Sequence, residues 1–362
     1  MFPTFVAGGA QVRTARLMAG LGSAYRHAVL ALDGTTDALA LVPPDVALEI
    51  VPAFPKAGSL RTVRALRSLL RSLRPALVLT YNWGAIDGVI AARLFLRGRV
   101  VHHEDGFGPD EADGFKRRRV WTRRVVLSGA DAVVVPSFTL AELATGTWGL
   151  AAGRVHRIAN GIRVEEFPTA DGNRALRNEL GIPARAFVVG SVGHLRTEKN
   201  PLRFVEAFAR VRAQEEVHGL VLGDGPEREG VLARARALGV DARLHLVGHR
   251  PEPQGYYRAM DAFCLSSDTE QMPVALLEAM AAKLPVVATD VGDVRRILPP
   301  EQHALVVGRD ASALAEGLSE LALDAERRAR LGAANHAHVR ATYSFETMLS
   351  AYRARYEHAL RA

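Results

Sequence analysis

The chain has 362 residues but only one cysteine, few aromatic residues and no long hydrophobic run. The single cysteine, Cys264, excludes an internal disulfide, and its place in the apolar run AFCL predicts a buried strand residue. No stretch approaches the roughly 18 consecutive apolar residues of a transmembrane helix. The first residues, MFPTFVAGGAQ, also lack the basic start and apolar segment of a signal peptide. We therefore expect a cytoplasmic protein.

The apolar residues are grouped in short runs that alternate with helical patterns. Runs typical of buried strands are RHAVLALD, ALVLTY, RVVHHE and DAVVVPS in the first half, and AFVVGSVG, HGLVLGDG, ARLHLVGH, DAFCLSS and PVVATD in the second. This alternation predicts parallel sheets with crossover helices. A chain of this length fits two domains of about 150 to 200 residues. The sequence thus predicts an α/β protein with two Rossmann-like, doubly wound domains, which bind ligands at the carboxyl ends of the strands, in a cleft between them.

Two features of the chain concern the limits of these domains. Gly, Pro, Asp and Asn accumulate in residues 160–186, so we place the boundary there, between a first domain of residues 1–165 and a second of residues 166–342. Only MFPTFV precedes the glycine-rich turn AGGAQ, and so short a segment with a proline makes a poor central strand. We therefore expect the first strand to be truncated or to lie upstream.

Positive charge is concentrated in the first half. Residues 1–165 hold 21 Lys and Arg against 13 Asp and Glu. The segment LRTVRALRSLLRSLRP is amphipathic, with arginines on one side and apolar residues on the neighbouring one: Arg64, Arg67, Arg71 and Arg74, and Val63, Leu66, Leu70 and Leu73. A second basic run, FKRRRVWTRR, follows.

Two interpretations of this basic half stay open. In the first, the leucines pack on the sheet and the arginines are solvated. In the second, the basic face binds an anionic membrane surface, where each basic residue contributes on the order of 1 kcal/mol. No basic-aromatic recognition module is present in the sequence, so we expect no nucleic-acid partner.

The loop GHLRTEKNPLRFVEAF follows a predicted strand and opens a predicted helix. Arg196 and Lys199 lie in it beside the free N–H groups of the helix start, a combination that can hold a diphosphate. The alternative is a loop with solvated charges. After the next predicted strand, Gly223, Asp224 and Gly225 form a turn that a ribose or base can approach closely, unless it is a turn and no more.

Two glutamates in SSDTEQMPVALLEAM lie around a predicted helix start. Pro273 suits the first turn of a helix, whose free N–H groups bind phosphate or sugar oxygens. Glu270 can accept hydrogen bonds from hydroxyls, and Glu278, about two turns later, reaches another part of an elongated ligand. A nucleotide sugar has that pattern of hydroxyls, diphosphate and ribose. The alternative is a solvated loop glutamate and a glutamate on a helix face.

Together these stretches resemble the family 4 glycosyltransferases, which are retaining enzymes of the GT-B fold, over nearly the whole chain. The resemblance rests on GGAQ, VVVPS, NGIRVEEF, the RTEK loop, GDGPE and the two glutamates followed by PVVATDVGD. It implies transfer of a sugar from a nucleoside diphosphate sugar to a glycan or lipid-linked acceptor. It implies no cofactor and no metal ion, because cations and helix N-termini neutralise the leaving diphosphate. It also implies a last helix, residues 343–362, that crosses back to the first, acceptor-binding domain.

The resemblance further implies roles for individual residues. Arg196 and Lys199 would hold the diphosphate, Glu270 the donor sugar and Glu278 the ribose. Backbone contacts or close approach to the donor would come from Gly8, Gly9, Gly193, Gly223, Asp224, Gly225, Gln271, Met272, Pro273 and Val274.

Several positions depart from the family pattern. Gln271 stands where the family usually has Gly, and Asp293 and Arg296 replace the second Gly and the Glu of GGxxE. Lys283 replaces another common Gly. Because Gln271 and Asp293 belong to the predicted sugar site, they leave the identity of the donor sugar open.

The segment VVHHEDGFGPDE is the predicted catalytic region of the first domain. Asp105 occupies a position at which family members often carry His, in H-x-E-H-G. Since side chains alternate along a strand, His103 and Asp105 share one face, and His102 and Glu104 share the other. We expect His103 and Asp105 to orient the acceptor hydroxyl or take its proton. The alternative is a cluster of satisfied polar groups at a strand end.

The resemblance therefore implies a cytoplasmic, retaining glycosyltransferase of bacterial surface polysaccharide or glycolipid assembly, with His103, Asp105 and Glu270 as its catalytic side chains. It would be peripheral to the inner face of the cytoplasmic membrane in the second interpretation of the basic half. Two alternatives are a nucleotide-sugar epimerase of the same architecture and a non-catalytic nucleotide-sugar binder.

Overall fold

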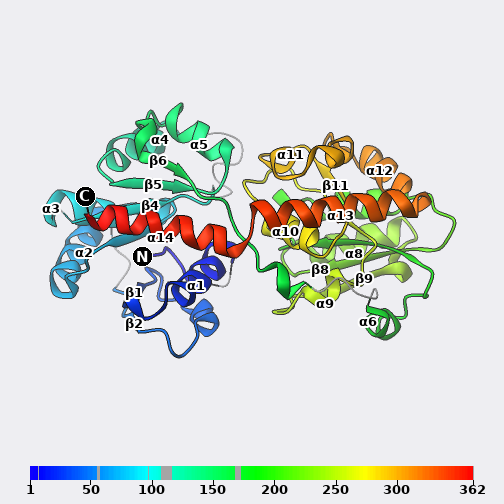
Figure 1. Ribbon diagram of the computed structural model, residues 1–362, viewed down its shortest axis with the longest axis horizontal. Helices are drawn as coiled ribbons and strands as arrows, with labels where there is room; N and C mark the ends of the chain where they lie inside the picture. The colour runs from blue at the N-terminus through cyan, green and yellow to red at the C-terminus, as the bar shows by residue number, and fades with distance from the viewer. Residues whose placement is uncertain (7, 55–57, 97, 107–115, 168–172, 362) are drawn as a thin grey trace. The chain divides into compact units, whose positions relative to one another are not determined.

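The computed structural model describes residues 1–362 except residues 7, 55–57, 97, 107–115, 168–172 and 362. The chain forms two compact units (Figure 1). Unit 1 comprises Met1–Asn160 and Glu346–Ala362, and unit 2 comprises Gly161–Phe345. The sequence predicts these limits at residues 165 and 342.

Unit 1 is built on parallel strands with helices between them. Its strands are β1 (His27–Leu30), β2 (Leu48–Val51), β3 (Val78–Tyr81), β4 (Val100–His103), β5 (Ala132–Val135) and β6 (Val155–Arg157). Its helices are α1 (Gly9–Leu21), α2 (Ser59–Leu73), α3 (Ile86–Leu96), α4 (Arg117–Leu127), α5 (Phe138–Thr145) and α14 (Phe345–Arg361). The strands form a two-stranded sheet, β1-β2, and a four-stranded sheet, β3-β4-β5-β6, and each pair is parallel.

The first residues of the chain lie between β1 and β3. Phe2 forms a parallel bridge with Ala31, and its N–H donates to Leu30 O at 2.9 Å. On the other side the N–H of Tyr81 donates to Met1 O at 3.1 Å. This segment takes the central position between the two sheets, so the strands of unit 1 follow the order 3-2-1-4-5-6 of a doubly wound domain.

Helix α2 uses its apolar face in the core of unit 1. Val63, Leu66 and Leu70 are buried there, whereas Arg64 and Arg71 are exposed. The helix ends at Leu73, so the predicted fourth arginine of its basic side, Arg74, lies beyond it as the C-cap residue. Among the described residues, every helix is too short or too polar to span a bilayer.

Unit 2 has one six-stranded parallel sheet. Its strands are β7 (Phe187–Val192), β8 (Val217–Leu222), β9 (Leu244–Gly248), β10 (Ala262–Leu265), β11 (Val286–Thr289) and β12 (Val306–Val307). Its helices are α6 (Arg174–Glu179), α7 (Pro201–Phe208), α8 (Arg228–Ala237), α9 (Gln254–Tyr257), α10 (Val274–Ala281), α11 (Val294–Ile297), α12 (Ala311–Leu323) and α13 (Ala325–Thr342). The order β12-β11-β10-β7-β8-β9 is again doubly wound, and it reverses between β7 and β10.

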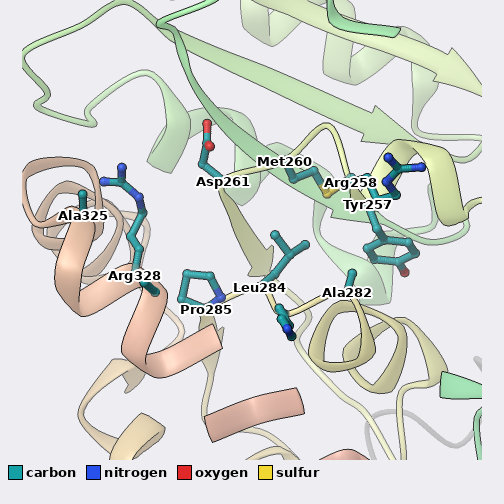
Figure 2. A pocket seen from close by; sticks show the side chains of 11 residues that line it. Tyr257, Arg258, Met260, Asp261, Ala282, Leu284, Pro285, Ala325 and Arg328 are labelled. Carbon is teal, nitrogen blue, oxygen red and sulfur yellow. The ribbon is translucent and has the colours of Figure 1, made fainter. Parts of the chain in front are cut away.

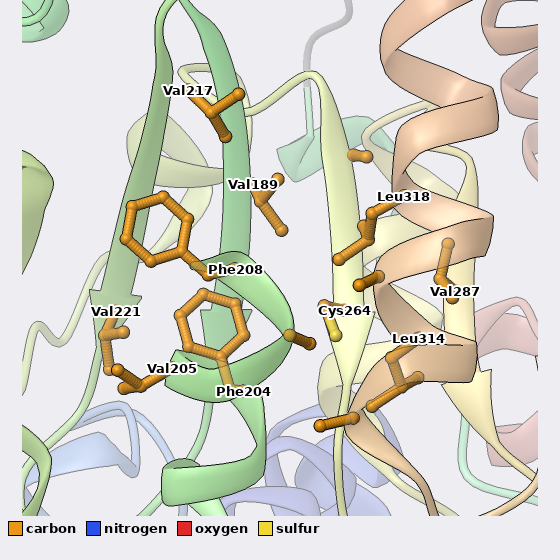
Figure 3. Packing of buried hydrophobic residues seen from close by; sticks show 14 of the residues in the cluster. Val189, Phe204, Val205, Phe208, Val217, Val221, Cys264, Val287, Leu314 and Leu318 are labelled. Carbon is orange, nitrogen blue, oxygen red and sulfur yellow. The ribbon is translucent and has the colours of Figure 1, made fainter. Parts of the chain in front are cut away.

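The core of unit 2 packs α7 and α12 on the sheet. Figure 3 shows part of this cluster, with Phe204, Phe208, Leu314, Leu318, Val189, Val221 and Cys264. Fully burying a side chain such as Phe or Leu contributes about 1.5–3 kcal/mol, so the packing fixes the strand ends that carry the site. Cys264 is buried in β10 as predicted, and burial raises the pKa of its thiol to about 12.

The predicted strand runs all form strands, and all three sheets are parallel as expected. The strands that were not predicted are β2, β6 and β12. They are short or half-exposed, so they carry little of the continuous apolar signal of a buried strand.

Candidate active site

The carboxyl ends of β7 and β10 bring two predicted loops together in unit 2. The two strands are neighbours in the sheet, with Val189 paired to Ala262, although β8 and β9 lie between them in the sequence. A doubly wound sheet binds ligands outside the strand ends at such a reversal. The loop after β7 carries Arg196 and Lys199, and the loop after β10 carries Glu270. The sheet order therefore makes the cationic loop and the first glutamate neighbours.

Glu270 is the centre of the polar contacts at this edge of the sheet. Lys199 Nζ donates to Glu270 Oε1 at 2.6 Å, and Ser267 Oγ donates to the same oxygen at 2.7 Å. The Glu270 side chain is 6% exposed and that of Lys199 is 35% exposed. Glu270 Oε2 makes no hydrogen bond to a described residue and keeps its acceptor capacity. The sequence assigned Lys199 and Glu270 to different parts of a ligand, whereas the structure joins them directly.

Polar side chains that the sequence analysis did not single out hold the two loops together. Arg203 Nη2 lies 2.6 Å from Asp268 Oδ1, and Arg203 Nη1 donates to Ser266 O at 2.7 Å. Asn200, which caps α7, donates from Nδ2 to Asp268 Oδ2 at 2.9 Å. Arg203 and Asp268 lie within the two quoted stretches of the sequence, but no local pattern shows that they pair with each other.

The turn after β8 packs against the loop after β7. Gly223 has a φ of 141°, and a Cβ on it would lie 1.9 Å from Gly193 O. Leu195 N donates to Asp224 O at 2.9 Å in the same contact. Glycine is therefore required at position 223 for the close approach of two backbone segments. This packing alone explains the glycine of the turn, in agreement with the alternative that the segment is a turn and no more. The contact of Gly223, Asp224 and Gly225 with a nucleotide stays a prediction.

A further glycine, Gly292, was quoted in PVVATDVGD but not predicted as a site residue. Its φ is 52°, in the left-handed region, and a Cβ on it would lie 1.8 Å from Glu270 O. Any side chain there would displace the backbone of Glu270. The turn after β11 thus sets the position of the glutamate in the turn after β10.

Helix α10 carries the second glutamate. Pro273 is its N-cap residue and Val274 its first residue, with Gln271 half-buried and Met272 buried just before them. These four residues lie at the helix start, as predicted, and their contact with a donor stays a prediction.

Glu278 accepts a hydrogen bond within unit 2. Tyr257 Oη donates to Glu278 Oε2 at 2.7 Å. Burial, and after it the Glu278 carboxylate, raises the pKa of Tyr257 well above its usual value, so the hydroxyl remains a donor. The ribose contact of Glu278 stays a prediction, and Tyr257 is a partner that the sequence did not reveal.

Arg196 is the least constrained of the predicted donor contacts. Its side chain is 51% exposed, and Nη1 lies 3.6 Å from Glu198 Oε1. A surface pair of this kind contributes about 0–1 kcal/mol, so the guanidinium is free to turn toward a more highly charged ligand.

In unit 1, Asp105 is held by Arg13 of α1. Arg13 Nη1 donates to Oδ1 at 2.6 Å and Nη2 to Oδ2 at 2.9 Å, and Nη1 also donates to Asn160 Oδ1 at 2.9 Å. The N–H of Asp105 donates to Asn82 Oδ1 at 2.8 Å. The Arg13 and Asp105 side chains are 7% and 16% exposed. Burial is the largest single effect and lowers the pKa of Arg13, but the charge and hydrogen bond of Asp105, together with Tyr352 and Tyr81, hold that pKa above its usual value, so the guanidinium is charged.

His103 lies in the interior of unit 1. Its Nδ1 lies 3.2 Å from Thr80 O, which fixes Nδ1 as a donor, and its Nε2 accepts from Tyr356 Oη at 3.0 Å. The ring stacks on Tyr81 with the centroids 4.3 Å apart. Burial, and then the Arg13 charge, lowers the pKa of His103 well below 6.5, so the ring is neutral. With both nitrogens occupied and 1% of the residue exposed, His103 is a poorer candidate for ligand contact than Asp105.

The predicted alternation along β4 holds on its other face. His102 Nε2 lies 3.5 Å from Glu104 Oε2, and Arg123 Nε lies 3.5 Å from the same oxygen, with all three side chains buried. His103 and Asp105, by contrast, share no hydrogen bond. The part of this segment from residue 107 onward lies outside the described residues.

The remaining predicted positions lie at the start of α1. Gly8 is its N-cap residue and Gly9 its first residue, and the first turn holds no acidic side chain, so its N–H groups keep a positive partial charge. Within the described part of the chain, no group of three His, Cys, Asp or Glu side chains could hold a metal ion. That the activity needs no metal ion stays a prediction.

Comparison with known proteins assigns both units to sequence families. The family described as "Glycosyl transferases group 1" matches residues 173–338, and the family described as "Glycosyl transferase 4-like domain" matches residues 8–161. The two matches follow each other along the chain and fall on unit 2 and unit 1.

Individual relatives agree with these matches. The D-inositol 3-phosphate glycosyltransferase of Xylanimonas cellulosilytica is 30% identical over 227 residues, which are 59% of this chain and 54% of the relative. The lipopolysaccharide core biosynthesis glycosyltransferase LpsE of Rhizobium meliloti is 30% identical over 177 residues, 49% of this chain and 51% of the relative. The matched part thus spans about half the length of these relatives.

A solved structure shares the fold over the whole chain. Anabaena Alr3699/HepE, in complex with UDP and glucose, superposes with a TM-score of 0.84 and 18% identity, and the alignment covers 98% of both chains. The doubly wound order of both units and this superposition confirm the predicted architecture. The chain therefore belongs to the group 1 glycosyltransferases and has the GT-B fold.

Proposed function

We propose that the chain is a retaining glycosyltransferase that moves a sugar from a nucleoside diphosphate sugar to a glycan or lipid-linked acceptor of a bacterial surface. The observation that carries this proposal is the contact of Lys199 and Ser267 with Glu270 at the strand-order reversal of unit 2. In this contact a cation, which suits the diphosphate, lies beside a carboxylate whose second oxygen can accept a hydrogen bond from a sugar hydroxyl. The name of the Rhizobium meliloti relative, which refers to lipopolysaccharide core, supports this acceptor class, whereas the D-inositol 3-phosphate in the other relative's name is neither a glycan nor lipid-linked.

Each group in the donor site has a separate task in this proposal. Lys199 and Arg196 neutralise the diphosphate as its bond to the anomeric carbon breaks, and Glu270 Oε2 accepts from a hydroxyl of the donor sugar. Lys199 is already fixed by its 2.6 Å contact with Glu270, so little reorganisation is needed when charge develops on the leaving group. Glu278 contacts the ribose.

Asp105 serves the acceptor in this proposal. Both of its oxygens are engaged by Arg13, but a carboxylate offers about four acceptor sites, so each oxygen keeps one for a hydroxyl. Arg13 holds the carboxylate in a fixed orientation, and His103 acts behind it as a buried, neutral support for β4.

The first test is a thermal-shift screen against UDP-, GDP-, ADP- and TDP-sugars. UDP-glucose is the first candidate because Alr3699/HepE was solved with UDP and glucose. A donor at 100 times its dissociation constant stabilises the protein by about 2.7 kcal/mol. For a unit of this size that corresponds to an increase in Tm of roughly 5–10 °C.

The same donor then distinguishes the catalytic alternatives. Incubation with an acceptor pool should give a product whose anomeric configuration, read from NMR couplings, equals that of the donor. A new sugar nucleotide formed without any acceptor would indicate an epimerase instead. If no sugar nucleotide changes Tm, the proposal fails.

We also infer that unit 1 binds an anionic membrane surface. Leu60 is 78% and Trp121 is 65% exposed, and exposed arginines lie near each in the sequence, including Arg61 and Arg118. The protein should sediment with phosphatidylglycerol vesicles at low salt, because each basic residue near the surface contributes on the order of 1 kcal/mol. Binding should fall steeply at high salt, because salt screens these charge interactions. Phosphatidylcholine vesicles are the control. Equal sedimentation with both vesicle types, or with neither, contradicts this inference.

A further inference from the structure

Unit 2 has a pocket, shown in Figure 2, at the opposite ends of the strands from the candidate active site. Its volume is about 260 Å³. Met260 and Asp261 directly precede β10, and Leu284 and Pro285 directly precede β11, so the pocket lies at the amino ends of these strands. Glu270 follows the carboxyl end of β10, so the two sites are separated by the length of the strands.

Positive charge dominates the lining of this pocket. Arg258, Lys283 and Arg328 line it, and Asp261 is the single acidic side chain among the lining residues. Asp261 already has partners: Arg177 Nη2 donates to its Oδ2 at 3.0 Å, and a backbone N–H of β7 donates to the same oxygen at 2.8 Å. Its charge is therefore compensated from outside the pocket, and the lining carries three cationic side chains.

Lys283 is held in a conformation that favours glycine. Its φ is 59°, at the turn between α10 and β11. A residue with a Cβ is less stable there than glycine would be. The side chain is exposed and forms no ion pair with any described residue. A strained position with a charged side chain facing a cavity suggests a function for that side chain.

Arg328 is fixed in place before any ligand binds. Its Nη1 donates to the carbonyls of Leu321 and Ala322 at the end of α12, and its guanidinium lies 5.4 Å from the ring centroid of Phe187. These contacts use one of its three nitrogens. Figure 2 shows Arg328 on one side of the pocket and Arg258 on the other, with Leu284 and Pro285 between them.

We propose that this pocket binds a small organic phosphate of about the size of a sugar phosphate. Cations on two sides suit the phosphate group, and the apolar side chains of Met260, Leu284 and Pro285 suit a carbon skeleton rather than a bare inorganic ion. The volume is below that of pockets for drug-sized ligands, which begin at about 300 Å³. Tyr257 also lines the pocket, and its hydroxyl donates a hydrogen bond to Glu278. An occupant would therefore contact the hydrogen-bond partner of a predicted donor-binding residue.

The test is isothermal titration of the intact protein with glucose 6-phosphate at low salt, with glucose as the uncharged control ligand. Lys283→Gly removes one cation and suits the left-handed backbone, so this variant should keep or raise its Tm. It should weaken glucose 6-phosphate binding roughly tenfold, the typical effect of losing one charged hydrogen bond. Arg236→Gln, which removes an exposed cation of α8 outside the pocket, should leave binding unchanged.

A third variant separates this pocket from the diphosphate loop. Arg196→Gln removes an exposed cation beside the candidate active site and should not alter glucose 6-phosphate binding. If Arg196→Gln weakens binding and Lys283→Gly does not, the ligand occupies the diphosphate loop and the proposal is wrong. Equal losses in Lys283→Gly and Arg236→Gln, binding of glucose as tight as that of its phosphate, or the absence of binding to the unmodified protein would each overturn it as well.

Discussion

Lys199→Ala is expected to lower kcat for sugar transfer about 10²- to 10³-fold, the usual effect of removing one preorganised group that stabilises transition-state charge. Lys199 Nζ lies 2.6 Å from Glu270 Oε1, so the ammonium is in place before the donor arrives. Removing it also leaves the Glu270 carboxylate, 6% exposed, with Ser267 as its remaining hydrogen-bond donor. We therefore expect the loss mainly in kcat, because the neutralisation matters most when the diphosphate leaves.

The pair should behave as a unit. Glu270→Ala is expected to cost a similar factor, and Lys199→Ala/Glu270→Ala no more than about tenfold beyond either single variant, because residues that act together are not additive. Lys199→Arg keeps the charge but not the geometry of an ammonium, and should lie between the unmodified enzyme and Lys199→Ala. Arg236→Ala, on the exposed face of α8, is the control for loss of charge. Steady-state kinetics that give Lys199→Ala a kcat within threefold of the unmodified enzyme would remove Lys199 from the proposed mechanism.

The second large effect is expected at the Arg13–Asp105 pair. Arg13→Met leaves Asp105, 16% exposed, without the guanidinium that engages both of its oxygens. Breaking a buried pair on one side costs about 3–5 kcal/mol of unfolding free energy. For a unit of this size the Tm should fall by roughly 6–20 °C, as measured by thermal unfolding.

Replacing both partners separates stability from activity. Arg13→Met/Asp105→Leu has no uncompensated charge, so its Tm should recover most of the loss. Its kcat should stay low, by 10²–10⁴, if Asp105 orients the acceptor hydroxyl. His103→Gln is the comparison: it alters a buried ring that touches no ligand in this proposal, so it should lower Tm more than kcat. A double variant as active as the unmodified enzyme would exclude Asp105 from the reaction.

The fold was predictable because its signals are local. Each run such as AFCL or VVAT is apolar throughout, and burial on both faces of a parallel sheet selects such runs. The position of the two loops at the strand ends was predictable for the same reason, since Arg196, Lys199 and Glu270 each follow a predicted strand. In a doubly wound sheet that is where ligands bind.

The contacts within the site were not predictable, because they join residues that are far apart in the chain. Lys199 meets Glu270 through the neighbouring positions of β7 and β10, and that order is a property of the whole sheet. Arg13 likewise reaches Asp105 from α1, and no pattern around either residue refers to the other. His103 was predicted beside Asp105 from strand alternation alone, which fixes a face but not the depth of a side chain.

The position of α14 has a consequence for the order in which the chain folds during synthesis. Unit 2 is continuous in sequence, whereas unit 1 consists of Met1–Asn160 and a final segment that begins at Glu346. Tyr356 supplies the hydroxyl for His103 from 253 residues further along the chain. Domains form as they leave the ribosome, and contacts between distant residues form late. We therefore expect unit 1, which is translated first, to be completed last. Strand β4, which ends just before Asp105, gains its contact with α14 only after all of unit 2 has been synthesised.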